Sequence, residues 1–336
     1  MPPLPPLLTS PPPTLTNTQA STLARQHFGI TGTLHRLTSE RDLNIRITTP
    51  TARYVLKLAN PAEPAALTDF QTEALLHLAA TNLPVPRVIR TLSGDTAAIT
   101  PHGTLRLLTY LDGTPQYATA QTPEQSCNLA RMAAALAIGL QGFTHPAAHH
   151  SLQWDIKNAS QLRPLLPAIA DPGLRDLATQ TLDRFDEGIG PIFGTLRAQV
   201  VHNDLNPHNI LTDPANPDAI SGILDFGDMV HTPLICDVAI TASYQINPTA
   251  PLQSLLIFAA AWHAILPLTQ AEIALLPDLI AARMLTTIAI TSARAAAFPE
   301  NAPYILRNFA QARDSLRALA ALDRTTVRTA LNQRLP

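Results

Sequence analysis

Short apolar stretches typical of β-strands dominate the first third of the chain, and apolar and polar residues alternate most cleanly at residues 43–47. They occupy residues 33–38, 43–47, 53–58, 87–92 and a hairpin over 96–110. A period of two is typical of β-strands that bury one face. A helical stretch at residues 65–80 interrupts them. This region therefore predicts a small mixed sheet of about five strands with one main helix beside it.

A helical pattern takes over from residue 123, because apolar residues there recur every three or four positions. The expected helices are residues 124–142, 172–188, 252–265, 270–297 and 303–322. Pro277 marks a candidate break in the fourth of them, since proline removes a helical hydrogen bond. The chain therefore predicts an α+β protein in which a small sheet lobe precedes a larger, mostly α-helical lobe.

The stretch VVHNDLNPHNILTDPANPDAISGILDFGD interrupts the helical pattern. Residues 209–212 leave a polar loop as a strand, and residues 213–218 are dense in turn-forming residues. Residues 219–224 then return as a second strand. The resulting hairpin is expected to bring Asp225, at its end, back beside Asn209, at its start.

Three side chains in this stretch suit phosphoryl transfer. Asn209 and Asp225, held together, offer the hard oxygen ligands that Mg²⁺ takes alongside phosphate oxygens. Asp204 lies on the same loop, five residues before Asn209, and is free to meet a substrate hydroxyl. The alternative is an unrelated hairpin with buried acids. The pattern favours catalytic roles for all three residues and a Mg²⁺ site at Asn209 and Asp225.

The same residues carry a family resemblance. The run from His202 to Asn209 resembles the H-x-D-x-x-x-x-N catalytic loop of kinases, and the DFG that begins at Asp225 resembles their metal-binding motif. HNDLNPHNIL and ILDFGD are similar to the aminoglycoside phosphotransferase superfamily, kinase-like enzymes that phosphorylate small molecules. SGILDFGDMVHTPLICDVAI most resembles the hydroxylysine kinase group. The resemblance covers about residues 20–325 and implies a bilobal protein kinase-like fold.

The resemblance implies nucleotide binding by the first lobe. Val55 and Lys57 share one face of a strand, so Val55 would cover a purine while Lys57 reaches the α- and β-phosphates of ATP or GTP. Glu73, from the following helix, would hold Lys57. The loop at residues 38–42 has no glycine where protein kinases carry a glycine-rich phosphate loop. Backbone groups near Ser39 are the candidate phosphate contacts there.

The resemblance also implies roles outside the motifs. Residues 109–113 would form the hinge between the lobes, where Thr109 and Leu111 contribute main-chain atoms to the nucleobase. Main-chain contacts of this kind do not distinguish ATP from GTP. Asp237 would begin a buried helix and bind backbone amides of the catalytic loop, and His202 would hold the conformation of that loop.

The candidate acceptor-binding residues are Trp154, Asp155, Asp228, Arg283 and Arg294. Trp154 and Asp155 match a position in hydroxylysine kinase-like sequences and would seat an ammonium group. The alternative is a packing Trp beside a helix-capping Asp. Arg283 and Arg294 fall on one face of an expected helix. They would clamp a substrate carboxylate or a phosphate, or else be surface residues that lie over apolar stems.

Composition limits the other classes of function. The net charge of −2 gives no electrostatic case for nucleic acid or an anionic membrane as a partner, and no stretch is expected to cross a membrane. Cys127 and Cys236 form neither a disulfide framework nor a metal-spaced motif, which predicts a reducing, cytoplasmic location. The Pro-rich residues 1–20 lack the features of a secretory signal. They predict a disordered tail, followed by a short helix capped by Ser21.

These observations predict a tail at residues 1–20, a nucleotide-binding lobe at 21–110 and a catalytic and substrate-binding lobe at 111–330. The predicted reaction moves the γ-phosphoryl group of ATP or GTP, with Mg²⁺, to a hydroxyl of a small amine or amino acid. The resemblance favours 5-hydroxylysine. Homoserine, choline, ethanolamine or an aminoglycoside are the alternative acceptors, and a catalytically silent nucleotide-binding module is the alternative of a different class. The sequence does not predict the oligomeric state.

Overall fold

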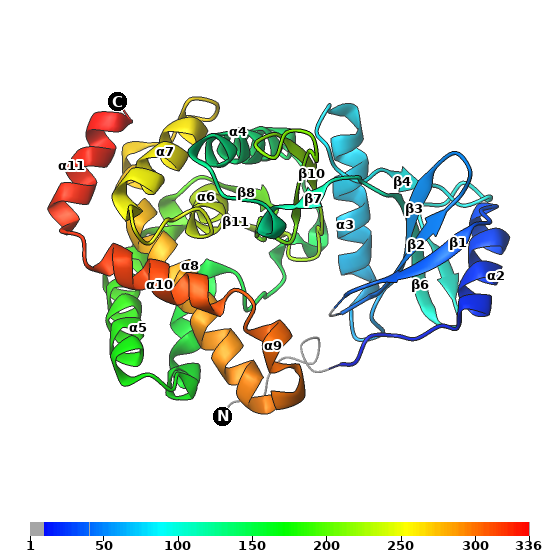
Figure 1. The fold of residues 1–336 in the computed structure, drawn as a ribbon, viewed down its shortest axis with the longest axis horizontal. Helices are drawn as coiled ribbons and strands as arrows, with labels where there is room; N and C mark the ends of the chain where they lie inside the picture. The colour runs from blue at the N-terminus through cyan, green and yellow to red at the C-terminus, as the bar shows by residue number, and fades with distance from the viewer. Residues whose placement is uncertain (1–9, 40, 336) are drawn as a thin grey trace.

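The computed structural model describes residues 10–39 and 41–335 and consists of two lobes (Figure 1). A small lobe built on a β-sheet contains the first part of the chain, and a larger helical lobe contains the rest. The predicted α+β arrangement is confirmed. The lobes meet beside helix α3 (Ala65–His77), which lies between the sheet and the helical lobe in Figure 1.

The first described helix, α2 (Asn17–Phe28), starts earlier than expected. A capping box closes its N-terminus: Thr16 Oγ1 accepts from Gln19 N, and the Gln19 side chain accepts from Thr16 N. Ser21 therefore lies inside the helix and is not its cap. The predicted disorder is wrong for the residues that this helix contains, and residues 1–9 lie outside the described part of the chain.

The small lobe contains a six-stranded sheet. Its strands are β1 (Thr33–Leu37), β2 (Leu43–Thr48), β3 (Arg53–Leu58), β4 (Val88–Ile89), β5 (Ala98–Thr100) and β6 (Gly103–Thr109). The order is β1-β2-β3-β6-β4, β5 also pairs with β6, and all these pairings are antiparallel. A mixed sheet of about five strands was expected. The difference arises because hairpins join β1 to β2, β2 to β3 and β5 to β6, and a hairpin reverses the chain.

The two faces of this sheet pack against different helices, because successive side chains of a strand point to opposite sides. Ile47 and Leu56 are buried with α2 on one face. Arg106 is buried on the other face and donates to Gln71 Oε1 of α3. α3 also contributes apolar side chains to the core of the large lobe. It therefore connects the sheet to the helical lobe.

The large lobe is mostly helical. Its α-helices are α4 (Pro123–Gly139), α5 (Pro172–Arg184), α6 (Leu234–Ser243), α7 (Pro251–His263), α8 (Gln270–Ala297), α9 (Ala302–Ile305), α10 (Phe309–Ala320) and α11 (Arg324–Arg334). The short helices of both lobes are η1 (Leu78–Ala80), η2 (Gln116–Ala118), η3 (Pro146–His149), η4 (Ile156–Ala168), the π-helix η5 (Phe185–Ile189), η6 (Gly190–Thr195) and η7 (Pro299–Asn301). The helix expected at residues 303–322 is divided into α9 and α10, and α11 was not predicted.

Helix α8 is the central helix of the large lobe and runs through Pro277 without a break. Its most apolar 18 residues have a mean hydropathy of 1.7, and the helix is long and apolar enough to cross a membrane by length and composition alone. The expectation that no stretch reaches this length is therefore wrong. In the structure, 83% of its most apolar window is buried inside the protein. α8 packs against α6, α10 and η4.

Candidate active site

Two small sheets position the residues of the predicted site. β9 (Ile210–Thr212) pairs with β10 (Ile220–Ile223) and with β7 (Thr114–Pro115), and β8 (Ala198–Val201) pairs with β11 (Val230–Pro233). β7 and β10 lie on the side of the large lobe that faces α3 (Figure 1). The predicted hairpin is confirmed, since it consists of β9 and β10.

The loop after β8 and the loop after β10 lie side by side. Leu224 N donates to Asn209 O at 2.7 Å, so Asp225 follows directly on the residue bonded to Asn209. His202 Nε2 lies 3.0 Å from Leu224 O, and His202 Nδ1 accepts from Asp204 N at 3.2 Å. Burial lowers the pKa of His202 to about 4, so its neutral ring joins the two loops. These contacts are the ones that His202 needs for its predicted role of holding the conformation of the catalytic loop.

Asp204 lies within a network of polar side chains. Its Oδ2 accepts from Asn209 Nδ2 at 2.8 Å and from Asn206 Nδ2 at 2.9 Å, and its Oδ1 accepts from Arg283 at 3.2 Å. Burial and repulsion from Asp228 raise the pKa of the Asp204 carboxyl to about 7, although Arg283 acts in the opposite direction. A carboxylate of this kind is suited to accepting a proton near neutral pH.

Asn209 and Asp225 fit the donor set that Mg²⁺ takes. Both Asn209 Nδ2 bonds go to Asp204, to its main-chain oxygen at 2.9 Å and its carboxylate at 2.8 Å, so the Asn209 amide oxygen remains for a metal ion. Asp225 is exposed to solvent, and its Oδ1 accepts from Gly227 N at 3.1 Å. Crowding by protein atoms works to raise the pKa of Asp225, but the charges of Lys57 and Arg41 outweigh it and hold the pKa below its usual value. Oxygen ligands completed by phosphate oxygens are typical of Mg²⁺ sites.

Lys57 has a different partner from the one predicted. Its Nζ lies 3.4 Å from Oδ2 of Asp42, the residue directly before β2. Glu73 makes no ion pair or hydrogen bond within the described part of the chain. The reason is the orientation of α3: Gln71 and its neighbour Thr72 face the sheet and bond Arg106, which turns Glu73 away from β3. The Lys57–Glu73 pair is therefore wrong for this structure.

The other predicted nucleotide contacts lie on the small lobe and the hinge. Val55 lies on β3 opposite Leu108 of β6, and Ser39 lies in the loop between β1 and β2. Thr109 N already donates to Arg87 O at 2.9 Å, so the predicted main-chain contact of Thr109 with a nucleobase would be made by its carbonyl oxygen and stays a prediction. The roles of Val55, Ser39 and Leu111 stay predictions.

Asp155 is buried, and its carboxylate oxygens are held by Lys157 and Thr232. Its Oδ1 accepts from Lys157 N and from Thr232 Oγ1, both at 3.0 Å, and its Oδ2 lies 3.3 Å from Lys157 Nζ. It caps the N-terminus of η4. The predicted ammonium seat is therefore wrong, and the alternative of a helix-capping Asp is confirmed. The reason is that the carboxylate is buried at the N-terminus of η4, where it accepts hydrogen bonds from a backbone amide and from a side-chain hydroxyl.

Arg283 lies between Trp154 and Tyr244. It donates to Trp154 O at 3.0 Å and to Tyr244 Oη at 3.2 Å, and its guanidinium carbon is 5.4 and 5.9 Å from the centres of the two rings. Arg294 lies eleven residues further along α8, roughly 16 Å along the helix axis. The two arginines therefore do not form a single clamp, and Arg283 instead orients Asp204.

Sequence reasoning missed three residues of this region: Arg41, Asn206 and Tyr244. Asn206 carried a signal, because it lies two residues from Asp204 within the motif loop. Tyr244 carried none, since its contact with Arg283 spans 39 residues of sequence and two different helical segments. Arg41 lies in the loop without glycines, and its guanidinium forms an ion pair with Asp228 at 2.5 Å. Asp228 is buried and held by this pair.

Asp237 supports the catalytic loop from α6. Its Oδ1 accepts from Asn203 N at 2.8 Å, and Asn203 is held at φ 65°, a left-handed conformation that is uncommon without glycine. Burial outweighs the bonds from the backbone amides and raises the pKa of Asp237 to about 6. The geometry agrees with the predicted role. Because the pKa is raised, this carboxyl destabilises the folded state progressively as the pH rises from its ordinary pKa of 3.8 to about 6, and the cost is constant above that.

Asp237→Ala is expected to lower the free energy of unfolding by about 1–3 kcal/mol, because the buried N–H of Asn203 loses its acceptor. Asp237→Asn keeps an acceptor oxygen and removes a buried charge, so it is expected to cost much less. Urea denaturation of both variants at pH 7 measures the difference. Equal losses in the two variants would show that the Asn203 bond is not what stabilises the loop.

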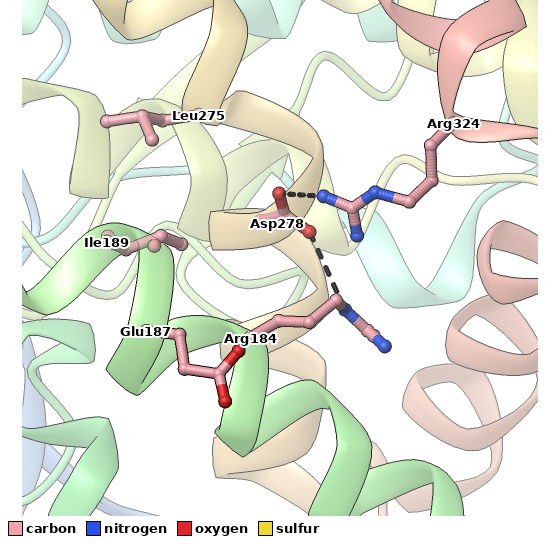
Figure 2. Close-up of a pocket in the computed structure, with 7 residues that line it drawn as sticks. Arg184, Glu187, Ile189, Leu275, Asp278 and Arg324 are labelled. Carbon is pink, nitrogen blue, oxygen red and sulfur yellow. Dashed lines mark hydrogen bonds and ion pairs between the residues drawn. The ribbon is translucent and has the colours of Figure 1, made fainter.

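A separate pocket of about 300 Å³ lies between α5, η5, α8 and α11 (Figure 2). Asp278 lies between two arginines there, 2.5 Å from Arg324 and 3.9 Å from Arg184. Its lining residues are Arg184, Glu187, Gly188, Ile189, Leu275, Asp278 and Arg324. None of them belongs to the loops that carry Asp204 and Asp225, so this pocket is not the site of the predicted chemistry.

Comparison with known proteins agrees with the fold and the motifs. Residues 33–276 match the model of the phosphotransferase enzyme family. Hydroxylysine kinase from Mus musculus is 29% identical over 324 residues, which cover 88% of this chain and 86% of that protein. Homoserine kinase from Methylobacillus flagellatus is 26% identical over 254 residues, 70% of this chain and 72% of that protein.

Among solved structures, amicoumacin kinase hAmiN in complex with AMP-PNP, Ca²⁺ and Ami has a TM-score of 0.68. It is 14% identical, and the match covers 93% of this chain and 97% of that one. At this identity the likeness shows the shared fold alone. It confirms the bilobal kinase-like fold that the motifs implied.

Proposed function

Because the chain belongs to the phosphotransferase enzyme family, we propose that it transfers the γ-phosphoryl group of ATP or GTP to a hydroxyl of a small amine or amino acid. The chain is a small-molecule kinase, and the proposal adds the donor, the acceptor class and the residue roles. One observation carries it: Asp204, Asn209 and Asp225 converge from two adjoining loops where the lobes meet.

In the proposed mechanism, Asp204 orients the acceptor hydroxyl and accepts its proton as the phosphoryl group is transferred. Arg283 and Asn206 hold the Asp204 carboxylate in place. Asn209 and Asp225 would hold Mg²⁺, which neutralises negative charge on the phosphates when bound. Lys57 contacts the α- and β-phosphates. Catalysis then depends mostly on positioning and electrostatics.

5-Hydroxylysine is the proposed acceptor. The likeness to hydroxylysine kinase over 88% of the chain supports it, and homoserine is the second candidate because homoserine kinases match 70% of the chain. Hydroxylysine carries an additional ammonium group. A site built to pair that group discriminates against analogues that lack it, since its own buried polar groups are then left unpaired. Asp155 is not proposed for this task.

The test is a panel of acceptors assayed with ATP and with GTP. We expect kcat/KM for 5-hydroxylysine to exceed that for homoserine by at least about tenfold. Choline, ethanolamine and an aminoglycoside complete the panel, and mass spectrometry identifies the phosphorylated product. A reaction without acceptor measures background nucleotide hydrolysis. A higher kcat/KM for homoserine would contradict the proposed acceptor but not the kinase function. Nucleotide binding without any phosphoryl transfer would favour a catalytically silent nucleotide-binding module.

A further inference from the structure

Arg41, in the loop between β1 and β2, extends toward the catalytic residues. Arg41 crosses from the small lobe and donates to Asp228 Oδ1 of the large lobe at 2.5 Å. A Cβ on Gly227 would lie 3.6 Å from an Arg41 guanidinium nitrogen. The guanidinium therefore lies over the Asp225-Phe226-Gly227 turn.

The base of this loop is fixed. Asn60 Nδ2 donates to Arg41 O at 2.9 Å, and Asn60 N donates to Asp42 Oδ1 at 3.1 Å. Asn60 is itself buried, at 1% exposed. These bonds hold the backbone of Arg41 and leave its side chain as the part that extends toward the large lobe. The Arg41 side chain remains 25% exposed, so solvent and a ligand can reach it.

Lys57 and Arg41 are two cations of the small lobe, and each is paired with a carboxylate. Without a ligand, Lys57 is paired with Asp42 and Arg41 is paired with Asp228. Both partners are carboxylates, which present the same kind of acceptor oxygens as a phosphate. Lys57 comes from the strand expected to contact nucleotide phosphates. The second cation therefore occupies the region where the outer phosphates of the same nucleotide would lie.

We propose that Arg41 binds the terminal phosphates of the nucleotide and replaces the contacts that a glycine-rich loop would make, with Asp228 holding it in place until the nucleotide arrives. The proposal rests on the proposed kinase function. A guanidinium presents a planar fork of donors that suits a phosphate in two-point contact. A loop without glycine does not bring its backbone as close to phosphates, and a long arginine side chain supplies the missing reach.

The alternative is that the Arg41–Asp228 pair only ties the two lobes together. The two ideas differ in how nucleotide affinity should change when Arg41 or Asp228 is removed. If Arg41 binds phosphate, its removal weakens nucleotide binding, whereas removal of Asp228 frees Arg41 and preserves or strengthens binding. If the pair is only a tie, removal of either partner breaks the same contact and shifts binding in the same direction.

The experiment measures the affinities of ATP, ADP and AMP with Mg²⁺ by calorimetry for the wild type, Arg41→Met, Arg41→Lys and Asp228→Asn. We expect Arg41→Met to weaken ATP binding by about 10–100-fold, to weaken ADP less and to leave AMP nearly unchanged. Arg41→Lys keeps the charge but not the planar fork of donors, so its ATP affinity is expected to lie between those of the wild type and Arg41→Met. Asp228→Asn is expected to bind ATP at least as tightly as the wild type.

Arg90→Met is the matched control, because Arg90 is exposed on the same lobe and, among the residues that the structure describes, donates only to Gly94 O. Thermal melting confirms that each variant is folded. A change below about threefold for Arg41→Met, equal losses for ATP and AMP, or losses in both Arg41→Met and Asp228→Asn would overturn the proposal while the kinase function stands. A wild type that binds no nucleotide would overturn both.

Discussion

Asp204→Asn is expected to lower kcat by about 10²–10⁴-fold, the contribution typical of a general base. Nucleotide affinity is expected to change little, because Asp204 acts on the acceptor rather than on the phosphates. The amide keeps the size of the carboxylate but does not accept a proton. It also satisfies only part of the network: an amide offers one acceptor, whereas Asp204 accepts from Asn209, Asn206 and Arg283.

The measurement is steady-state kinetics with the best acceptor of the panel, together with ATP affinity and thermal melting. Asp176→Asn makes the same chemical change on the exposed side of α5 and serves as the control. We expect its kinetics to match the wild type. If folded Asp204→Asn keeps more than about a third of wild-type kcat, Asp204 is not the residue that accepts the proton.

The parts of the fold that the sequence predicted well are those in which the pattern is local. The strand at residues 53–58 and the helix at residues 270–297 have the predicted bounds, because a short run of β-prone residues and a long, mostly apolar helical pattern are each properties of neighbouring residues. The hairpin that joins Asn209 to Asp225 was predicted for the same reason. Its turn residues and its two strands lie within 17 residues of one another.

The predictions that failed depend on how elements are turned toward one another. Glu73 has suitable chemistry and spacing, but the rotation of α3 places Gln71 toward the sheet instead. Asp155 has the charge of an ammonium seat, but packing of η4 buries it as a cap. Neither rotation nor burial follows from the spacing of charged residues along the chain.

The contacts that the sequence did not indicate are long-range. Arg41 and Asp228 are 187 residues apart, and Arg283 and Asp204 are 79 residues apart. No local pattern brings such residues together, because their contact is a result of how the two lobes and α8 are placed. The motif residues could be named from the sequence, whereas the side chains that position them could be identified only in the structure.

Asp225→Ala is expected to remove nearly all activity, by at least about 10²–10³-fold at saturating nucleotide, because it removes charge stabilisation at the transferring phosphate. It also removes a negative charge that Lys57 and Arg41 stabilise, while those two cations keep their own carboxylate partners, Asp42 and Asp228. Asp225 has φ 58°, a conformation that Ala adopts less readily than Asp or Asn. Asn adopts this backbone conformation as readily as Asp and has the same size. Asp225→Asn therefore weakens the metal ligand without disturbing the turn, and its comparison with Asp225→Ala separates the two effects.

The decisive measurement for Asp225 is the Mg²⁺ dependence of ATP binding and of activity in both variants. We expect the Mg²⁺ concentration for half-saturation to rise sharply in Asp225→Asn and Asp225→Ala alike, because each lacks the carboxylate that binds the metal most strongly. Asp213→Ala removes a carboxylate from the turn at the other end of the same hairpin and is expected to leave that concentration unchanged. An unchanged half-saturation point in the Asp225 variants would mean that the metal ion is bound elsewhere, and the loss of activity would then have to come from the turn.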